Sequence, residues 1–301
     1  MKHTSDTSIN PTDMEIPALD QAQLKAFIIA GLEEDIKDGD HTSLACIPAD
    51  AQASARLIFK DAGVIAGISV AEAIFKHVDP NVRFETKVED GAPMDFGMIA
   101  FHVTCNAQAL LKAERLVLNT MQRLSGIATL SNRFAFEVED LSVTVLDTRK
   151  TTPLLRFLEK WAVKLGGCSN YRTGLYDRYM IKDNHIDASG GIKQAIERVN
   201  TYKREKNVDL PITVEVRNLD ELHQVLEIGQ IDRIMLDNFE LPLLREAVIV
   251  VNGAHETEAS GGVNISTIRE IAKTGVDYVS VGALTHSAQS LDMSLKVIKD
   301  A

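Results

Sequence analysis

The stretch Leu141–Pro153, LSVTVLDTRKTTP, decides the fold of the second half of this chain. Its first six residues are mostly apolar or β-branched, as in a strand that is buried on both faces of a parallel sheet. Two adjacent cations, Arg149 and Lys150, follow together with three threonines. Because ligands of parallel α/β folds bind beyond the carboxyl ends of the strands, this loop predicts a local anion site.

The alternation of strand and helix continues to the end of the chain. Candidate strands lie at 142–147, 178–182, 211–216, 231–236, 254–259 and 277–281. Their spacing of about 20 to 35 residues is typical of βα units in a parallel sheet. Six or seven such units would curve into a barrel. With fewer than eight strands, that barrel would be incomplete. The fold class that we predict is therefore α/β, with a parallel and incomplete α/β barrel.

The first part of the chain has a different rhythm. Residues 53–105 form short strand-like pieces separated by glycines, with a helical segment at Ala71–His77, which indicates an α+β module. Helical spacing of apolar residues covers Gln21–Leu32 and residues 107–138. We place a break at Gly126 within the second of these helices.

These patterns give the predicted domain organisation. We expect a flexible tail over residues 1–20, an N-terminal α+β sandwich domain over 21–125, and the α/β barrel domain over 126–301. A last helix at about Leu291–Lys299 is expected to pack against the N-terminal domain.

Composition narrows the class of protein. The chain has 301 residues and a net charge of −11, which argues against a general nucleic-acid-binding surface. No run of about 18 apolar residues is present, so we expect no membrane span. The three cysteines, Cys46, Cys105 and Cys168, lack the spacing of a disulfide framework. A reduced, cytoplasmic setting follows, and we interpret Cys168 as a packing residue rather than a reactive thiol.

Polar side chains stand at the ends of the candidate strands. They are Arg149, Lys150, Lys182, Glu215, Asp237 and Glu258. One such residue means little, but a series at one edge of one sheet would build a shared pocket.

Two glycine-containing loops follow the last two strands. Ser260, Gly261 and Gly262 precede a helical segment, and Ser280–Ala283, SVGA, follows the final strand. Glycines let backbone N–H groups approach a phosphate, and barrels of this kind commonly bind phosphate after their last strands. Either loop alone is equally well explained as an ordinary turn.

Cations accumulate in the same part of the chain. Four of them belong to the strand-end region: Arg149, Lys150, Arg172 and Lys182. Arg115 is a fifth candidate on a helix, where a surface charge is the simpler interpretation. Such a set suits a dicarboxylate together with several phosphates. Glu215 and Asp237 would then bind ribose hydroxyls, or Mg²⁺ through water.

Longer motifs connect the chain to a known family. Residues Lys164–Leu175, KLGGCSNYRTGL, are followed by Met180–His185, MIKDNH, and the chain closes with Gly282–Ser287, GALTHS. With the DTRK motif at 147–150, they resemble the quinolinate phosphoribosyltransferases, also called carboxylating nicotinate-nucleotide pyrophosphorylases. The resemblance covers nearly the whole chain beyond about residue 20.

The resemblance implies a reaction. Members condense quinolinate with phosphoribosyl pyrophosphate and release pyrophosphate and CO₂, giving nicotinate mononucleotide for de novo NAD biosynthesis. It also implies a Mg²⁺ cofactor carried by the pyrophosphate substrate, with no direct protein ligand. A homodimer or larger assembly is implied as well, in which Arg115 completes the site of a neighbouring subunit. Neither nucleic acid nor membrane is expected as a partner.

The resemblance also assigns residues. The catalytic set would be Lys150, Lys182, Glu215 and Asp237. The quinolinate carboxylates would be held by Arg115, Arg149, Arg172 and Lys182, with Thr148 and Lys150 nearby. Glu215 and Asp237 would contact the ribose. The 5′-phosphate would be held by Ser260, Gly261, Gly262, Val281, Gly282 and Ala283.

One position departs from the family pattern. Members usually have histidine before the second arginine, whereas this chain has Tyr171 before Arg172. Tyrosine offers a hydrogen bond but no positive charge at neutral pH, so a role that needs an imidazolium is in doubt. His286, in the closing motif, is expected to support the pocket rather than to react.

Three other functions fit parts of the pattern. A related phosphoribosyltransferase with another carboxylated acceptor, like those found beside molybdate transport, would use a similar pocket. An aldolase-like barrel would use Lys150 or Lys182 as a Schiff-base nucleophile. A non-catalytic barrel would bind phosphorylated metabolites without turnover, and Tyr171 is the feature that favours it.

Overall fold

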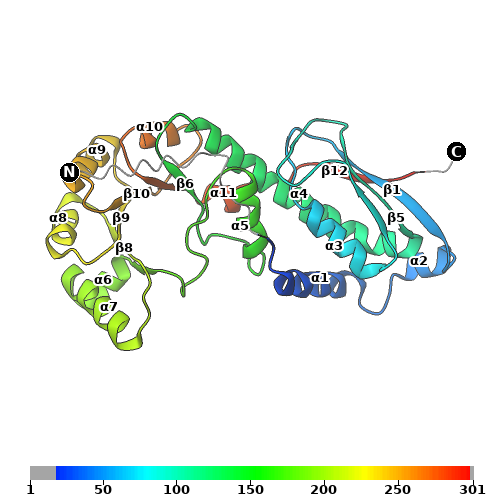
Figure 1. Ribbon diagram of the computed structural model, residues 1–301, viewed down its shortest axis with the longest axis horizontal. Helices are drawn as coiled ribbons and strands as arrows, with labels where there is room; N and C mark the ends of the chain where they lie inside the picture. The colour runs from blue at the N-terminus through cyan, green and yellow to red at the C-terminus, as the bar shows by residue number, and fades with distance from the viewer. Residues whose placement is uncertain (1–17, 299–301) are drawn as a thin grey trace, which may run out of the picture. The chain divides into compact units, whose positions relative to one another are not determined.

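The computed structural model describes residues 18–298, which pack into two compact units. Within these residues, unit 1 comprises 18–132, 157–167 and 288–298, and unit 2 comprises 133–156 and 168–287. Figure 1 labels their helices and strands. The tail predicted for residues 1–20 lies almost entirely outside the described residues. The sequence-based limits 21–125 and 126–301 stay a prediction.

Unit 1 is built on a four-stranded antiparallel sheet. Its order is β12 (Met293–Ile298), β1 (Gln52–Phe59), β5 (Ile99–Asn106) and β3 (Arg83–Thr86). A short ribbon pairs β2 (Gly63–Val64) with β4 (Pro93–Met94). The helices are α1 (Gln21–Ile36), α2 (His41–Cys46), α3 (Ile68–Val78), α4 (Ala107–Glu137) and α5 (Arg156–Leu165).

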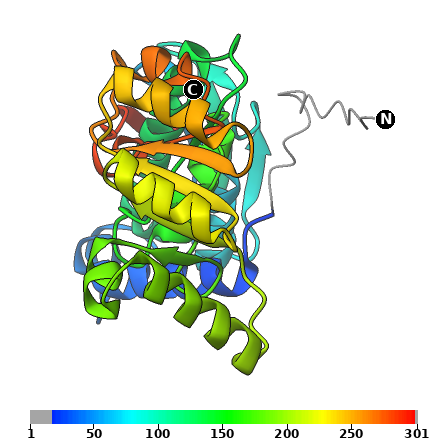
Figure 2. The ribbon, with the colours of Figure 1, turned by 90° about the vertical axis from the view of Figure 1, so that its left-hand side faces the viewer.

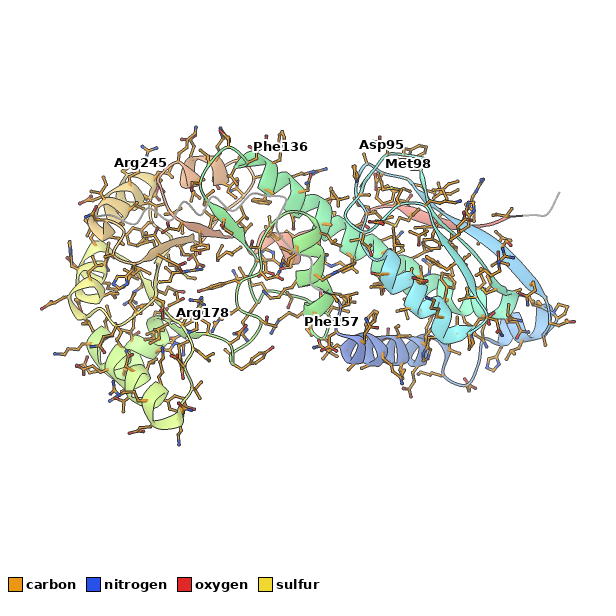
Figure 3. The ribbon with its side chains drawn as sticks, in the orientation of Figure 1. Asp95, Met98, Phe136, Phe157, Arg178 and Arg245 are labelled. Atoms are coloured by element: carbon orange, nitrogen blue, oxygen red, sulfur yellow. The ribbon has the colours of Figure 1, made fainter. Side chains whose placement is uncertain are left out.

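Aromatic side chains form much of the core of unit 1. Phe75 of α3 lies 6.2 Å from Phe101 of β5, measured between ring centroids, and both side chains are fully buried. Helix α3 therefore covers one face of the sheet. Phe27 of α1 meets Phe157 of α5 edge-to-face, with ring centroids 6.4 Å apart; Figure 3 labels Phe157. These contacts confirm the predicted α+β module.

The predicted last helix, Leu291–Lys299, is wrong. Residues Met293–Ile298 form strand β12, which pairs antiparallel with β1 and places Leu295 opposite Leu57. Met293 and Leu295 are buried and Ser294 between them is more exposed, which is the period of a strand. The free edge of β1 supplies hydrogen-bond partners for the backbone of this segment, and these favour a strand over a helix.

The break predicted at Gly126 is also wrong, because α4 continues through this residue. A Cβ atom at Gly126 would overlap the backbone carbonyl oxygen of Gln289. The glycine therefore permits a close approach of another backbone segment and does not interrupt the helix.

Unit 2 contains the six predicted strands, all of which are confirmed with somewhat shifted or shorter limits. They are β6 (Thr144–Leu146), β7 (Tyr179–Ile181), β8 (Ile212–Val216), β9 (Arg233–Asp237), β10 (Glu256–Ser260) and β11 (Tyr278–Ser280). Every neighbouring pair is parallel. The strands are short and strongly buried, and β8 is buried along its whole length. The sheet is that of an incomplete parallel α/β barrel.

Helices follow the strands of unit 2 and cover the outer side of the sheet. They are α6 (Asp183–Ser189), α7 (Ile192–Lys206), α8 (Leu219–Ile228), α9 (Leu241–Val251), α10 (Ile268–Ala272) and α11 (Ala283–His286). Figure 2 shows α7, α8 and α9 side by side in front of the strands.

The barrel is open between its first two strands. The sheet order is β6-β11-β10-β9-β8-β7, so β6 and β7 are the two ends of the sheet. Ser169 lies beside the free edge of β6: its N–H donates to the Val145 carbonyl at 2.8 Å, and its carbonyl accepts from the Asp147 N–H at 3.0 Å. The segment that precedes Arg172 is thus held against the open edge.

Gly126→Ala should destabilise the protein by about 1–3 kcal/mol, because the added methyl group has to displace backbone. Alanine also raises helix propensity by about 1 kcal/mol, which offsets part of the loss. The matched control is Gly31→Ala in α1, where the new Cβ would meet only the movable side-chain end of Leu116. Urea unfolding would measure both. Equal stability of the two variants would contradict the backbone contact at Gly126.

Candidate functional site

A cavity of about 720 Å³ lies at the carboxyl ends of the strands of unit 2. Its lining includes predicted residues from every strand end: Thr148, Arg149, Lys150, Arg172, Lys182, Glu215, Asp237, Ser260, Gly261, Gly262, Gly282 and Ala283. Parallel strands deliver their ends to one edge of the sheet, and this brings together residues that are far apart in the sequence.

Two arginines mark one part of the cavity. The Nε atom of Arg149 is buried, and among residues 18–298 it has no hydrogen-bond partner. Burial and the neighbouring charge of Arg149 lower the pKa of Arg172. Two guanidinium groups are therefore held near each other with incomplete compensation. A carboxylate would supply both the missing acceptor and the missing negative charge.

Carboxylates occupy the ends of β8 and β9. Lys182 Nζ is 2.9 Å from Glu215 Oε2, and Glu215 is buried. Asp237 accepts from the Ser260 hydroxyl at 2.7 Å and from the Asn238 amide at 2.8 Å. These contacts fix the carboxylate oxygens at the cavity wall, where they can accept hydrogen bonds from hydroxyl groups of a ligand.

The loop after β10 requires its glycines. Gly261 and Gly262 have φ angles of +92° and +62°, which are strained for other residues. A Cβ at Gly261 would also overlap the side-chain amide of Asn238. The Asn238 N–H donates to the Ser260 carbonyl at 2.9 Å. Asn238 therefore holds both Asp237 and the glycine loop in place.

The loop after β11 is only partly directed at the cavity. Gly282 lines it, and a Cβ there would lie 3.1 Å from both Lys150 Cδ and His286 Nε2. Val281 has a fully buried side chain, and its N–H donates to the Leu146 carbonyl at 2.8 Å. Of the six residues assigned to phosphate, Val281 is the one outside the cavity lining.

Asp147 is a site residue that sequence reasoning missed. It is fully buried after β6, where its Oδ2 accepts from the Asn170 amide at 2.8 Å and its Oδ1 from the Tyr171 N–H at 2.8 Å. The carboxylate therefore ties the segment before Arg172 to the loop that carries Arg149. The signal was present, because Asp147 opens the polar loop after the first strand.

Arg115 is not brought to this cavity lining. It is an exposed residue of α4 in unit 1. Across residues 18–298 no group of three or more His, Cys, Asp or Glu side chains could hold a metal ion. None of the helices in the same residues is long and apolar enough to cross a membrane.

Comparisons with known proteins agree with this geometry. Family models described as the N-terminal and C-terminal domains of quinolinate phosphoribosyl transferase match residues 40–125 and 127–296. The chain belongs to the quinolinate phosphoribosyltransferase family.

Individual relatives extend over almost the full chain. The Nicotiana tabacum quinolinate phosphoribosyltransferase [decarboxylating] 1b is 44% identical over 93% of this chain and 84% of the relative. A probable nicotinate-nucleotide pyrophosphorylase [carboxylating] of Bacillus subtilis is 38% identical over 93% and 95%. The crystal structure of NadC from Streptococcus pyogenes has a TM-score of 0.88 at 36% identity, over 94% of this chain and all of the other.

Tyr171, the position that departs from the family pattern, also lines the cavity. Its hydroxyl lies 2.9 Å from Thr213 Oγ1 on β8. Burial, together with the charge of Glu258, raises its pKa to about 12. The phenol is therefore neutral at physiological pH, and this position contributes a hydrogen bond but no charge.

The raised pKa of Tyr171 predicts a loss of stability in alkali. A tyrosine of the unfolded chain ionises near pH 10, whereas Tyr171 in the fold does so near 12. Its contribution is complete below the lower value and is lost as the pH rises toward the upper one, by roughly 2–3 kcal/mol. Urea unfolding at about pH 9 and about pH 11 should show a steeper decline for the wild type than for Tyr171→Phe. Tyr202→Phe, at a half-exposed site, is the matched control. Parallel declines of wild type and Tyr171→Phe would contradict the burial of the phenol.

Proposed function

We propose that this protein transfers phosphoribose from phosphoribosyl pyrophosphate to quinolinate with loss of CO₂. The products would be nicotinate mononucleotide and pyrophosphate, and the reaction would serve de novo NAD biosynthesis. The observation that carries the proposal is the pair Arg149 and Arg172, whose incompletely compensated guanidinium groups line the cavity. Other parts of the same cavity wall carry side chains and glycine loops that suit ribose and phosphate. The names of the relatives support the same reaction.

The arginine pair is the proposed binding site for the carboxylates of quinolinate. Guanidinium groups bind carboxylates through two parallel hydrogen bonds, which fix the ring plane as well as its position. Lys182 and Lys150, which line the same cavity, add positive charge without a fixed geometry. A substrate with two carboxylates uses this set more fully than one with a single carboxylate.

The other part of the cavity is the proposed site for phosphoribosyl pyrophosphate. Glu215 and Asp237 would accept hydrogen bonds from the ribose hydroxyls. The loops at Ser260–Gly262 and at Gly282 offer space for the 5′-phosphate, since glycines allow the backbone to come close. Bound Mg²⁺ would neutralise charge on the pyrophosphate as it leaves. The two carboxylates could hold it through water.

The chemistry then needs positioning more than proton transfer. The bond from ribose C1 to pyrophosphate breaks and leaves a cation-like carbon, which nearby carboxylates tolerate. The ring nitrogen of quinolinate attacks this carbon, and the ring becomes a pyridinium. The bond to the adjacent carboxylate breaks, CO₂ leaves, and its electron pair stays on the ring carbon, which takes up a proton. Holding both substrates in line would supply most of the acceleration.

The ion pair at Lys182 counts against an aldolase-like alternative. A Schiff-base nucleophile needs an amine that is available to attack a carbonyl carbon, whereas Lys182 Nζ is engaged with Glu215 Oε2 at 2.9 Å. Treatment with a carbonyl substrate and borohydride should leave no adduct on Lys182 or Lys150. A lysine adduct found by mass spectrometry would revive that alternative.

We propose a cytoplasmic location as well, in keeping with the free thiols of Cys46 and Cys105. Plant relatives are named as chloroplastic or mitochondrial proteins, so cell fractionation is the direct test.

Arg172→Ala should lower kcat/KM for quinolinate by about 10²–10³-fold, because it removes one guanidinium group that would bind a quinolinate carboxylate through two hydrogen bonds. The assay follows nicotinate mononucleotide and CO₂ from the two substrates with Mg²⁺, and a chelator should stop it reversibly. The matched control is Arg198→Ala on the exposed side of α7, which should retain wild-type kinetics. Wild-type kinetics in Arg172→Ala would show that the carboxylate site is misassigned.

The proposed homodimer makes Arg115 part of a neighbour's site, and mixing two inactive variants tests this. Arg115→Ala and Arg172→Ala would each be nearly inactive alone. In a mixture that has exchanged subunits, each mixed dimer has one intact site, so about a quarter of wild-type activity should return. Activity that stays at the level of the separate variants would contradict the shared site, as would full activity of Arg115→Ala.

A further inference from the structure

The segment that carries Arg172 needs support from outside the sheet. It runs along the side where β6 and β7 do not pair, and Ser169 meets Leu146 in an isolated bridge rather than in a strand. The carboxylate of Asp147 then holds the amide of Asn170 and the N–H of Tyr171. Both anchors lie on the β6 side, so the opposite side of the opening requires a different contact.

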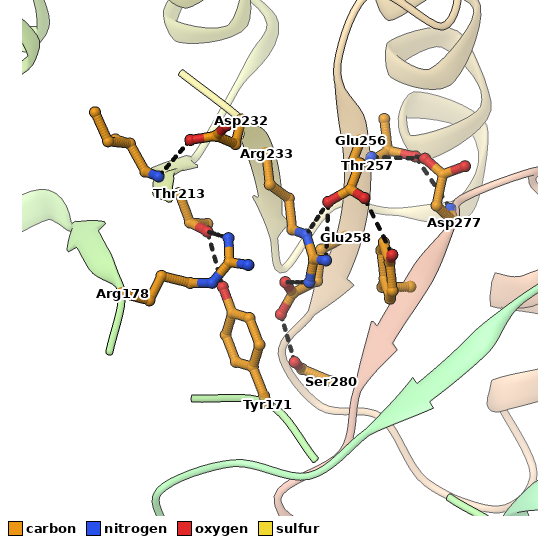
Figure 4. Close-up of polar contacts among 12 residues, drawn as sticks. Tyr171, Arg178, Thr213, Asp232, Arg233, Glu256, Thr257, Glu258, Asp277 and Ser280 are labelled. Carbon is orange, nitrogen blue, oxygen red and sulfur yellow. Dashed lines mark hydrogen bonds and ion pairs between the residues drawn. The ribbon is translucent and has the colours of Figure 1, made fainter. Parts of the chain in front are cut away.

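The side chain of Tyr171 makes that contact. Its hydroxyl lies 2.9 Å from Thr213 Oγ1 on β8, which is the neighbour of β7 in the sheet. Thr213 also accepts from Nη1 of Arg178, the residue just before β7, at 3.1 Å. Tyr171 therefore reaches from the β6 side of the opening to the β7–β8 side, as Figure 4 shows.

Two arginines lie close to the ring of Tyr171. The guanidinium carbons of Arg178 and Arg233 lie 5.5 Å and 5.4 Å from its centroid, within the range of cation–π contacts. Arg233 is buried and bonded to Glu258 at 3.0 Å and to Glu256 at 2.9 Å, and Glu258 also accepts from Ser280. A buried, fully bonded ion pair resists movement because each displaced charge would lose its partner.

We propose that Tyr171 is a positioning residue that sets the place of Arg172, and with it the affinity for quinolinate, through the hydroxyl bond to Thr213. Tyr171 and Arg172 share a peptide bond and both line the cavity. If Tyr171 becomes more mobile, Arg172 therefore becomes more mobile as well. A displacement of about 1 Å is enough to impair a bidentate carboxylate contact. The proposal rests on the proposed function, because it names quinolinate as the ligand of Arg172.

Two substitutions that remove the same bond provide the test. Tyr171→Phe removes only the hydroxyl and keeps the ring beside Arg178 and Arg233, and Thr213→Val removes the hydroxyl partner while keeping the shape of the side chain. KM for quinolinate and its dissociation constant, by titration calorimetry, should rise about 5–10-fold in Tyr171→Phe, as expected for one hydrogen bond. KM for phosphoribosyl pyrophosphate and kcat should stay within about twofold. Thr213→Val should match or exceed this effect, because it also releases Arg178.

The double variant should weaken quinolinate binding by less than the sum of the two single effects, because both substitutions remove the same hydroxyl bond. Thr257→Val is the matched control: it removes another buried strand threonine hydroxyl, bonded to Asp277, that is not part of the cavity lining. It should leave the quinolinate constants unchanged.

The outcomes separate this proposal from the proposed function. Additive effects of the two substitutions, an equal rise of both KM values, or quinolinate constants that stay at the wild-type value would overturn the role of Tyr171 while turnover persists. Absence of both turnover and quinolinate binding in the wild type would overturn the proposed function and this proposal with it.

Discussion

The buried carboxylate of Asp147 is the contact on which the cavity depends. It follows β6 directly, and it accepts hydrogen bonds from the residues that precede Arg172. One side chain therefore joins the loop of Arg149 and Lys150 to the segment of Arg172, along the edge where the barrel lacks a strand pair. Because a buried carboxylate without donors costs several kcal/mol, the segment and the carboxylate hold each other in place.

Charge is divided within the cavity in a way that an overall net charge of −11 does not suggest. Arg149 and Arg172 remain incompletely compensated, and the pKa of Arg172 is lowered by burial and by its neighbour. Glu215 and Asp237 are already held by Lys182, Ser260 and Asn238. One region therefore attracts an anion, whereas the other offers oriented acceptors to hydroxyl groups.

The sequence predicted the parts of the fold that depend on local pattern. The six strands of unit 2 were found because buried β-branched runs, such as the one before Asp147, are distinct from their amphipathic helices. The residues at their ends followed from the geometry of parallel sheets. The prediction of a last helix was wrong because MSLKVI, at 293–298, is short enough for a helix or a strand. Pairing with the free edge of β1 selects the strand.

Other features depend on partners that a local pattern cannot show. Gly126 has the appearance of a helix break until the backbone of Gln289 is placed against it. Asn238 acts on Gly261 and Ser260, which follow one helix later in the chain. Tyr171 departs from the family motif, and its bond to Thr213 is visible only when β8 lies beside the open edge. These residues share one property: their contacts are long-range.

The central claim is that the cation set exists to bind two carboxylates and to direct decarboxylation. The most direct measurement compares quinolinate with nicotinate as acceptor, using purified protein, phosphoribosyl pyrophosphate and Mg²⁺. The account predicts nicotinate mononucleotide and an equal amount of CO₂ from quinolinate, and no product from nicotinate. Equal product from both acceptors, or binding of both substrates without turnover, would contradict it.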